Sequence, residues 1–206
     1  MFKYIYLKNI CDIFVAIILF ILLLPIFIII SLLIKSDSNG PILYISKRSG
    51  LNAKPFIIFK FRTMKVGSHK GPSTTSKNDL RVTKIGRFLR KTKFDEFPQL
   101  INIILGQMSF IGPRPELLKY TNLYNSKESI ILSVKPGLSD FSSLKYFSLN
   151  KLINNENPDE YFEKNILENK NQLRINYAEK ISFIVDFKIL IKTIFKVINS
   201  IFKYDK

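Results

Sequence analysis

The chain has 206 residues, enough for one domain with a hydrophobic core and one appended element. Its 32 lysines and arginines exceed its 16 acidic residues, and the net charge of +16 predicts a polyanionic partner: nucleic acid, anionic lipid or a phosphorylated substrate. With Cys11 as the only cysteine and His69 as the only histidine, the sequence excludes an intrachain disulfide and a cysteine metal cluster, and any histidine-based catalysis would depend on one residue of a polar loop.

The first predicted element is an uncharged segment over residues 13–34, which is long enough for a membrane helix. The sequence after it has no small-residue cleavage site, which favours a retained segment over a signal peptide. Pro25 divides it into legs of 12 and 9 residues, roughly 18 and 14 Å long, each short of a ~30 Å hydrocarbon core. The residues alone leave two interpretations open: a single span with a proline kink, or a re-entrant hairpin. Lysines on both flanks place both ends in the cytoplasm, as the hairpin requires.

Residues 41–64 alternate apolar and polar side chains around SGLNAKP, a pattern that predicts a β-hairpin with its turn near Gly50 to Lys54. Lys60 and Arg62 lie two residues apart on its second arm and therefore on one strand face, which by itself is typical of a solvated surface. A polar segment without periodicity, residues 66–79, follows as a lid or a linker. Arg90 then lies on a short predicted helix, three residues after Arg87.

The segment KFDEFPQLINIIL places Asp95 and Glu96 at or just before the start of a buried helix, with Pro98 in its first turn. The positive end of the helix dipole favours anions there. The following GPRPE holds Arg114 between two prolines, and a guanidinium on such a backbone suits a phosphate or a planar base. Each of these features has an ordinary explanation as a helix start or a turn.

Residues 176–206 form the last predicted helix. Lys188, Lys192, Lys196 and Lys203 recur at or near every fourth position, and isoleucines and phenylalanines occupy the rest of the surface. This pattern is typical of a helix lying in a membrane interface. A core helix with a solvated lysine stripe is the alternative.

Taken together, the apolar N-terminus, FKFRTM, GRFLRKT before FDEFPQL, MSFIGPRPE and KPG resemble the bacterial sugar transferases, the small monotopic phosphoglycosyl transferases. The resemblance extends from about residue 8 to residue 197. It implies an α+β, mostly helical fold with a re-entrant membrane helix, a small β-hairpin and interfacial amphipathic helices. We therefore expect a membrane anchor over residues 1–36, a cytoplasmic catalytic domain over residues 37–175, and a C-terminal interfacial helix over residues 176–206 packed on that domain.

The resemblance implies transfer of a sugar 1-phosphate from a nucleotide sugar, usually a UDP-sugar, to a polyprenyl phosphate, undecaprenyl phosphate, at the cytoplasmic face of the bacterial inner membrane. Such a transfer initiates a surface glycan. The family's nucleophilic aspartate falls on Asp95 and its glutamate on Glu96, and both are expected near a bound Mg²⁺. The partners implied are the nucleotide sugar, the polyprenyl phosphate and inner-membrane phospholipid, and no nucleic acid.

The same resemblance assigns the substrate-binding residues and the break in the membrane helix. The break falls on Pro25. The residues expected to hold substrate or its phosphates are Lys60, Arg62, Arg90, Pro113, Arg114 and Pro115.

The sequence departs from the family pattern in three places. Leu24 stands where a serine often precedes the proline of the membrane helix, Lys93 stands where serine is common, and Ser139-Asp140 replaces the usual Thr-Gly after KPG. The sugar, the glycan and the oligomeric state do not follow from the sequence. Two other functional classes are a membrane-tethered nucleic-acid binder, suggested by the charge, and an inactive scaffold of the same fold.

Overall fold

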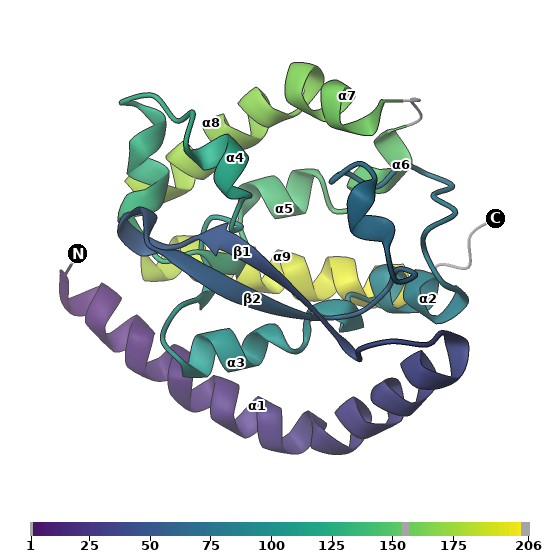
Figure 1. Ribbon diagram of the computed structural model, residues 1–206. Coiled ribbons are helices and arrows are strands. Elements are labelled where there is room, and N and C mark those ends of the chain that lie inside the picture. Colours follow the sequence, from purple (N-terminus) through teal and green to yellow (C-terminus); the bar gives the residue numbers. More distant parts are fainter. Residues whose placement is uncertain (1, 154–156, 203–206) are drawn as a thin grey trace.

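The computed structural model describes residues 2–153 and 157–202, apart from the side chains of Phe2, His69 and Lys151. Helices dominate and the described strands form two small sheets, which confirms the predicted α+β, mostly helical class. Figure 1 shows the β1–β2 hairpin across the middle of the molecule, with α1 below it and α7 and α8 above it. The strands are β1 (Leu43–Ser49), β2 (Pro55–Phe61), β3 (Ser109–Ile111) and β4 (Gly137–Ser139). The helices are α1 (Phe2–Asp37), α2 (Lys84–Thr92), α3 (Gln99–Ile104), α4 (Leu118–Thr121), α5 (Phe141–Lys145), α6 (Leu149–Leu152), α7 (Pro158–Asn165), α8 (Leu167–Glu179) and α9 (Phe183–Phe202), with 3₁₀ turns η1 (Leu51–Ala53), η2 (Ser68–Lys70), η3 (Phe94–Glu96) and η4 (Glu128–Ser133).

Helix α1 is one continuous helix that contains Pro25, so the expected break is a bend and not an interruption. Figure 1 shows this bend, with the middle of α1 farthest from the body and its ends directed toward it. Proline lacks an N–H and clashes with the preceding turn, which is sufficient cause for the bend. By length and composition alone, residues Lys3–Asp37 are the only described helix that could cross a membrane.

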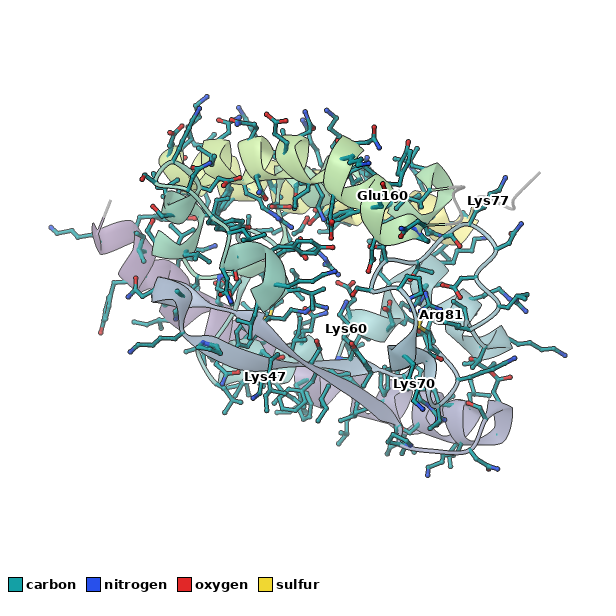
Figure 2. All side chains as sticks on the ribbon, turned by 45° about the horizontal axis from the view of Figure 1, so that its top comes forward. Lys47, Lys60, Lys70, Lys77, Arg81 and Glu160 are labelled. Carbon is teal, nitrogen blue, oxygen red and sulfur yellow. The ribbon has the colours of Figure 1, made fainter. Side chains whose placement is uncertain are left out.

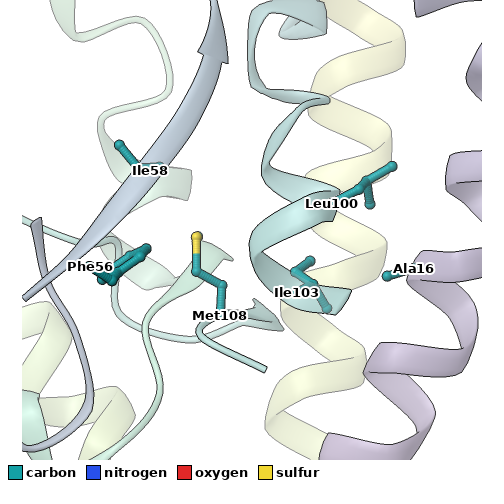
Figure 3. Close-up of a cluster of buried hydrophobic side chains, with 6 residues drawn as sticks. All are labelled: Ala16, Phe56, Ile58, Leu100, Ile103 and Met108. Atoms are coloured by element: carbon teal, nitrogen blue, oxygen red, sulfur yellow. The ribbon is translucent and has the colours of Figure 1, made fainter. Parts of the chain in front are cut away.

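Both legs of α1 pack on the body. Ala16 on the first leg joins a core cluster with β2 and α3, and Ile30 and Ile34 on the second leg pack against Phe61 and Leu89. Figure 3 shows Leu100 and Ile103 of α3 between Ala16 on one side and Phe56, Ile58 and Met108 on the other. Burying these side chains places α3, and the turn η3 that precedes it, at a defined depth in the protein.

The predicted β-hairpin is confirmed. Strands β1 and β2 pair antiparallel from Leu43 opposite Phe61 to Ser49 opposite Pro55. The turn lies where SGLNAKP predicts it, closed by a 2.9 Å bond from the Gly50 amide to the Lys54 carbonyl. The second sheet was not anticipated: β3 and β4 pair in parallel, bringing the segments around GPRPE and KPG together.

The C-terminal helix begins later than expected. Helix α8 continues through residue 176 to Glu179, because Ile175, Tyr177 and Ala178 are buried core residues. Helix α9 buries Asp186 and Ile189 against the body and exposes a face that includes Phe187, Ile191 and Phe195. The lysines do not share one environment: Lys196 donates to the Leu144 carbonyl of the body, Lys188 and Lys192 are exposed, and Lys203 lies outside the described residues.

Candidate active site

The Asp95–Glu96 pair is held in the turn η3 between α2 and α3. Thr83 caps the start of α2 by accepting a 3.0 Å hydrogen bond from the Gly86 amide. Lys93 ends this helix in the left-handed conformation, with φ +63°, and so turns the chain back on itself. The reversal directs Asp95 inward, where it is 8% exposed, before Pro98 begins the turn into α3.

Glu96 is bound by two cations from distant parts of the chain. Arg114 binds both carboxylate oxygens, through Nη1 to Oε2 at 2.8 Å and through Nη2 to Oε1. Lys60, on β2, donates from Nζ to Oε1 at 3.3 Å. In Figure 2, Lys60 lies in the middle of the molecule, between the strand layer and the helices above it. A bidentate arginine pair is strong and directional, so Glu96 has little freedom to reorient.

The backbone around Arg114 is held by the parallel pairing of β3 and β4. The Gly137 amide donates to the Pro113 carbonyl at 3.0 Å, and a Cβ on Gly112 would meet the Lys135 carbonyl oxygen at 2.4 Å. Only glycine permits so close an approach at position 112. Pro113 and Pro115 are buried on either side of Arg114 and rigidify its backbone.

Asp140, a departure from the family pattern, is part of this support. It is completely buried, caps α5 through a 2.6 Å bond from the Ser143 amide, and accepts from the Arg114 amide at 3.3 Å. Its neighbour Ser139 shares a 2.7 Å hydroxyl hydrogen bond with Thr193 of α9. Asp140 therefore holds the backbone of Arg114, and Ser139 connects the C-terminal helix α9 to β4.

Asp95 is less restrained than Glu96. Its Oδ1 atom is buried and has no hydrogen-bond partner in the part of the chain that the structure describes. Burial, followed by the negative charge of Glu96, raises the pKa of Asp95 above its usual value, against the opposing charges of Lys60, Lys93 and Arg90. Burial also acts to raise the pKa of Glu96, but Arg114 and Lys60 outweigh it and hold that pKa well below its usual range. The pair thus consists of a fixed anion and a carboxyl group with an unused oxygen.

Arg90 and Lys93 contribute charge near Asp95 without binding it directly. The Arg90 guanidinium donates from Nε to Thr63 Oγ1 at 2.8 Å and from Nη1 to Thr75 Oγ1 at 2.9 Å. Thr75 belongs to the polar segment 66–79, which is thereby attached to the site. Lys93 donates to the Phe147 carbonyl at 3.1 Å.

Arg62 lies elsewhere. Its guanidinium donates to the carbonyls of Asn39 at 2.5 Å and Ser38 at 2.6 Å, so it closes the segment that follows α1. β2 ends at Phe61, and beyond it the strand alternation no longer places Arg62 beside Lys60. The structure therefore brings together Lys60, Arg90, Asp95, Glu96 and Arg114, but not Arg62. The side chain of His69 lies outside the described residues.

A second buried charge cluster, centred on Glu116, was missed by the sequence reasoning. Glu116 Oε2 accepts from Arg174 Nη2 at 2.8 Å and lies 3.7 Å from Lys170 Nζ, and its Oε1 lies 3.8 Å from Arg48 Nη1. These residues come from β1, the GPRPE segment and α8. The available signal was Glu116 itself, directly after the Pro-Arg-Pro segment, together with two cations spaced by four residues on a helix.

The residues fit a Mg²⁺ that shares its coordination with a substrate. Within the described ranges, no three His, Cys, Asp or Glu side chains gather as a self-sufficient metal site. Mg²⁺ is commonly bound by one or two carboxylates and by substrate phosphates. The unpartnered Oδ1 of Asp95 meets the first need, whereas both oxygens of Glu96 are already bound by cations.

Comparison with known proteins shows which family the chain is similar to. The sequence model of the family described as bacterial sugar transferase matches residues 3–200. The UDP-glucose:undecaprenyl-phosphate glucose-1-phosphate transferase of Klebsiella pneumoniae is 34% identical over 193 residues, which are 92% of this chain and 39% of that protein. An uncharacterized sugar transferase of Bacillus subtilis (strain 168), EpsL, is 33% identical over 94% of this chain and 88% of its own.

A third relative carries a different sugar in its name. The UDP-N-acetylgalactosamine-undecaprenyl-phosphate N-acetylgalactosaminephosphotransferase of Aeromonas hydrophila is 34% identical over 68% of this chain and 34% of its own. The chain thus spans about two fifths of the length of the Klebsiella relative and about a third of the Aeromonas relative.

Proposed function

Because this chain belongs to the bacterial sugar transferase family, we propose that it is a phosphoglycosyl transferase acting on undecaprenyl phosphate. It would take a sugar 1-phosphate from a nucleotide sugar, a UDP-sugar by analogy with the names of its relatives, and so initiate a surface glycan. The observation that carries this proposal is the buried dyad. Arg114 and Lys60 hold Glu96, while Asp95 beside it keeps one buried oxygen without a partner among the described residues.

The proposed reaction is a double displacement at phosphorus. An oxygen of Asp95 attacks the sugar-bearing phosphorus, the bond to the bridging oxygen breaks, and the nucleoside monophosphate leaves with the bond electrons. An oxygen of the polyprenyl phosphate then attacks the same phosphorus and releases the Asp95 carboxylate. Two steps suit a site that must receive a soluble donor and a lipid acceptor in turn.

The cations around the dyad address the repulsion between a carboxylate and an anionic diphosphate. Lys60, Arg90 and Arg114 come from three different elements and converge on Asp95 and Glu96, where they would stabilise charge that develops on the phosphoryl oxygens. A Mg²⁺ held by Asp95 and substrate phosphates, with Glu96 beside it, would neutralise further phosphate charge. Arg114 would also hold the nucleotide or its phosphates, on the backbone that Pro113 and Pro115 rigidify.

We propose a monotopic arrangement on the cytoplasmic face of the bacterial inner membrane. Near the start of α1, Tyr4 and Lys8 donate to Asp186 Oδ2 on α9 at 2.6 and 2.5 Å. At its end, Asp37 accepts from the Ile85 amide on α2 at 3.0 Å. Since both ends of the helix bind one body, both would lie on one side of the membrane, and the bend would carry the exposed apolar residues into the lipid. This favours the re-entrant form over a span.

The exposed apolar face of α9 supports an interfacial position for that helix as well. Phe187 and Phe195 are more than half exposed, at 52% and 63%, which is costly in water and favourable in a headgroup region. Changing Ile191 and Phe195 to serine in the full chain should weaken vesicle binding without unfolding the body. Loss of the folded state would instead indicate a core helix.

A donor screen tests the transferase proposal. The full chain, with Mg²⁺ and undecaprenyl phosphate, is mixed with a panel of UDP-sugars, and release of UMP and formation of lipid-linked sugar are measured. We expect UMP release with at least one sugar, lost on addition of a chelator. Absence of release with every donor would remove the proposal in favour of an inactive scaffold.

Labelling tests the topology separately. Cysteines at positions 3 and 35, in a Cys11→Ser background, should react alike with an impermeant thiol reagent applied to one side of the membrane. Opposite reactivity would show a full span.

A further inference from the structure

A cavity of about 80 Å³ lies between the dyad and the Glu116 cluster. It is large enough for several waters or one compact polar group. Strand β2, the GPRPE segment and α8 all contribute to its wall. The charged residues that line it are Arg48, Lys60, Arg114, Glu116, Lys170 and Arg174.

The charges around this cavity do not balance. Five cations line it, but Lys60 and Arg114 are bound to Glu96, which leaves Arg48, Lys170 and Arg174 with Glu116, the one carboxylate among the lining residues, all of which are described. Glu116 is shared by three of the cations, at 2.8 Å from Arg174, 3.7 Å from Lys170 and 3.8 Å from Arg48. Buried charge that lacks a counter-charge is costly and is retained where a ligand supplies the missing partner. An anion with more than one negative charge would compensate this excess of positive charge.

Two of the arginines that line the cavity each have a buried hydrogen-bond donor without a partner among the described residues. Arg174 is 1% exposed, and its Nε atom has no partner among the described residues. The Nε of Arg48 is likewise buried without a partner in the described part of the chain. Buried donors are satisfied in the great majority of cases, so unsatisfied donors in residues that line a cavity point to an absent acceptor. Guanidinium groups match the geometry of phosphate oxygens.

We propose that this cavity, built by Arg48, Lys170 and Arg174 around Glu116, binds the dianionic phosphate of a phosphate monoester. Lys60 and Arg114 line the cavity and also bind Glu96, so a phosphate there is adjacent to the dyad. Under the proposed function, on which this identification rests, two species carry such a group: the nucleoside monophosphate that leaves and the polyprenyl phosphate that enters. Both present the same headgroup chemistry.

Burial, and then the charge of Arg174, lowers the pKa of Lys170 to about 8, as expected for a lysine whose charge lacks sufficient compensation. A bound dianion would stabilise the charged form of the lysine and raise its pKa toward the usual value. The buried charge of Lys170 should therefore destabilise the folded protein when the cavity is empty, and a bound anion should remove this cost.

Equilibrium binding to the full chain in detergent tests the proposal without any turnover. The probes are inorganic phosphate, UMP and farnesyl phosphate, each measured by calorimetry and by the rise in thermal midpoint. We expect Lys170→Met to weaken at least one of them about tenfold or more, and Lys170→Arg to retain binding, because it keeps the charge. The matched control is Lys164→Met, since Lys164 is a surface lysine of α7 whose side chain is 71% exposed.

The outcomes separate the sources and the alternatives. Weaker UMP binding alone assigns the cavity to the leaving nucleotide, and weaker farnesyl phosphate binding alone assigns it to the acceptor. Phosphate binding that is equal in the wild type, Lys170→Met and Lys164→Met overturns the proposal, as does the absence of all binding.

The free protein gives a second readout. Removal of an undercompensated charge should leave the thermal midpoint of Lys170→Met unchanged or raised, whereas a purely structural ion pair with Glu116 predicts a fall and would overturn the proposal. A chain that binds phosphate through Lys170 but releases no UMP from any donor refutes the proposed function and leaves the binding site intact.

Discussion

Two partly buried glutamates, Glu96 and Glu116, lie on opposite sides of Arg114 in the chain and organise two different kinds of site. Glu96 is bound by Lys60 and Arg114 and has a second acid, Asp95, as its neighbour. Glu116 is bound by Arg48, Lys170 and Arg174 and is the one acid among the residues that line its cavity, all of which are described. Beside Glu96, the Oδ1 acceptor of Asp95 lacks a partner among the described residues, and beside Glu116, the Nε donors of Arg48 and Arg174 lack one.

The cluster around Glu96 is therefore suited to a chemical step, whereas the cluster around Glu116 is suited to binding an anion. A carboxylate oxygen without a partner, beside a second carboxylate, is available to attack a phosphorus or bind a metal. Donors without a partner, beside an excess of cations, are available to receive an anion. The comparison predicts that changes at Asp95 mainly lower activity, whereas changes at Glu116 mainly lower stability.

The largest expected effect is on activity, at the dyad. On the proposed mechanism, Asp95→Asn removes the charged attacking oxygen and should lower sugar-phosphate transfer roughly a thousandfold or more, measured as UMP release. Because burial raises the pKa of Asp95, its charge is unfavourable in the folded protein, so the variant should be as stable as the wild type or more so. Activity near that of the wild type would exclude Asp95 as the nucleophile.

The next effect is on stability, at the second cluster. Glu116→Gln leaves three cations without their carboxylate and should lower the free energy of unfolding by about 3–5 kcal/mol, measured by denaturant unfolding. Despite burial, Lys170 and Arg174 lower the pKa of Glu116 to about 2, from 4.5. Its stabilisation is therefore present above pH 4.5 and lost as the pH falls toward 2, so the variant and the wild type should converge in acid. A constant difference over that range would contradict the assignment.

A smaller effect, with a characteristic pH range, is expected from Lys170. Burial lowers its pKa from 10.5 to about 8, so the unfolded chain binds more protons than the folded one between these values. Stability should therefore rise with pH from 8 to 10.5, by about 3 kcal/mol at most, in the wild type relative to Lys170→Met. The charged groups that act on Lys170 are Arg174, Glu116, Arg114 and Asp140. Parallel unfolding profiles for the two proteins would exclude a perturbed Lys170.

The smallest effect should come from Asp140, which connects the two clusters through the backbone of Arg114. Asp140→Ala removes the cap of α5 and should destabilise the protein by about 1 kcal/mol, with a several-fold loss of kcat/KM as Arg114 loosens. Asp140→Asn keeps a capping oxygen and is the matched control. Equal activity in both variants and the wild type would show that Arg114 is positioned without Asp140.

Much of the fold follows from local patterns. The β-hairpin and its turn at Gly50 to Lys54 lie where alternation and turn residues predict them, and α3 follows the dyad as FPQLINIIL indicates. The parallel pairing of β3 with β4 was not predictable from local sequence, because three residues on each side carry no clear period and the strands are separated by a long segment. The start of the C-terminal helix was misjudged, because the polar surface residues of α8 concealed the buried positions near Tyr177 that belong to α8.

The sequence by itself determined the long apolar N-terminal helix, the hairpin, the acid pair and the cation between prolines, since each depends on residues close together in the chain. Only the tertiary structure decided which cations serve which acid. Lys60 and Arg114 reach Glu96 from 36 and 18 residues away, and Arg174 reaches Glu116 across 58 residues. Arg62, two residues from Lys60, binds the carbonyls of Ser38 and Asn39 in the segment that follows α1 instead. Long side chains find their partners through the packing of distant elements, and spacing along one strand does not encode that packing.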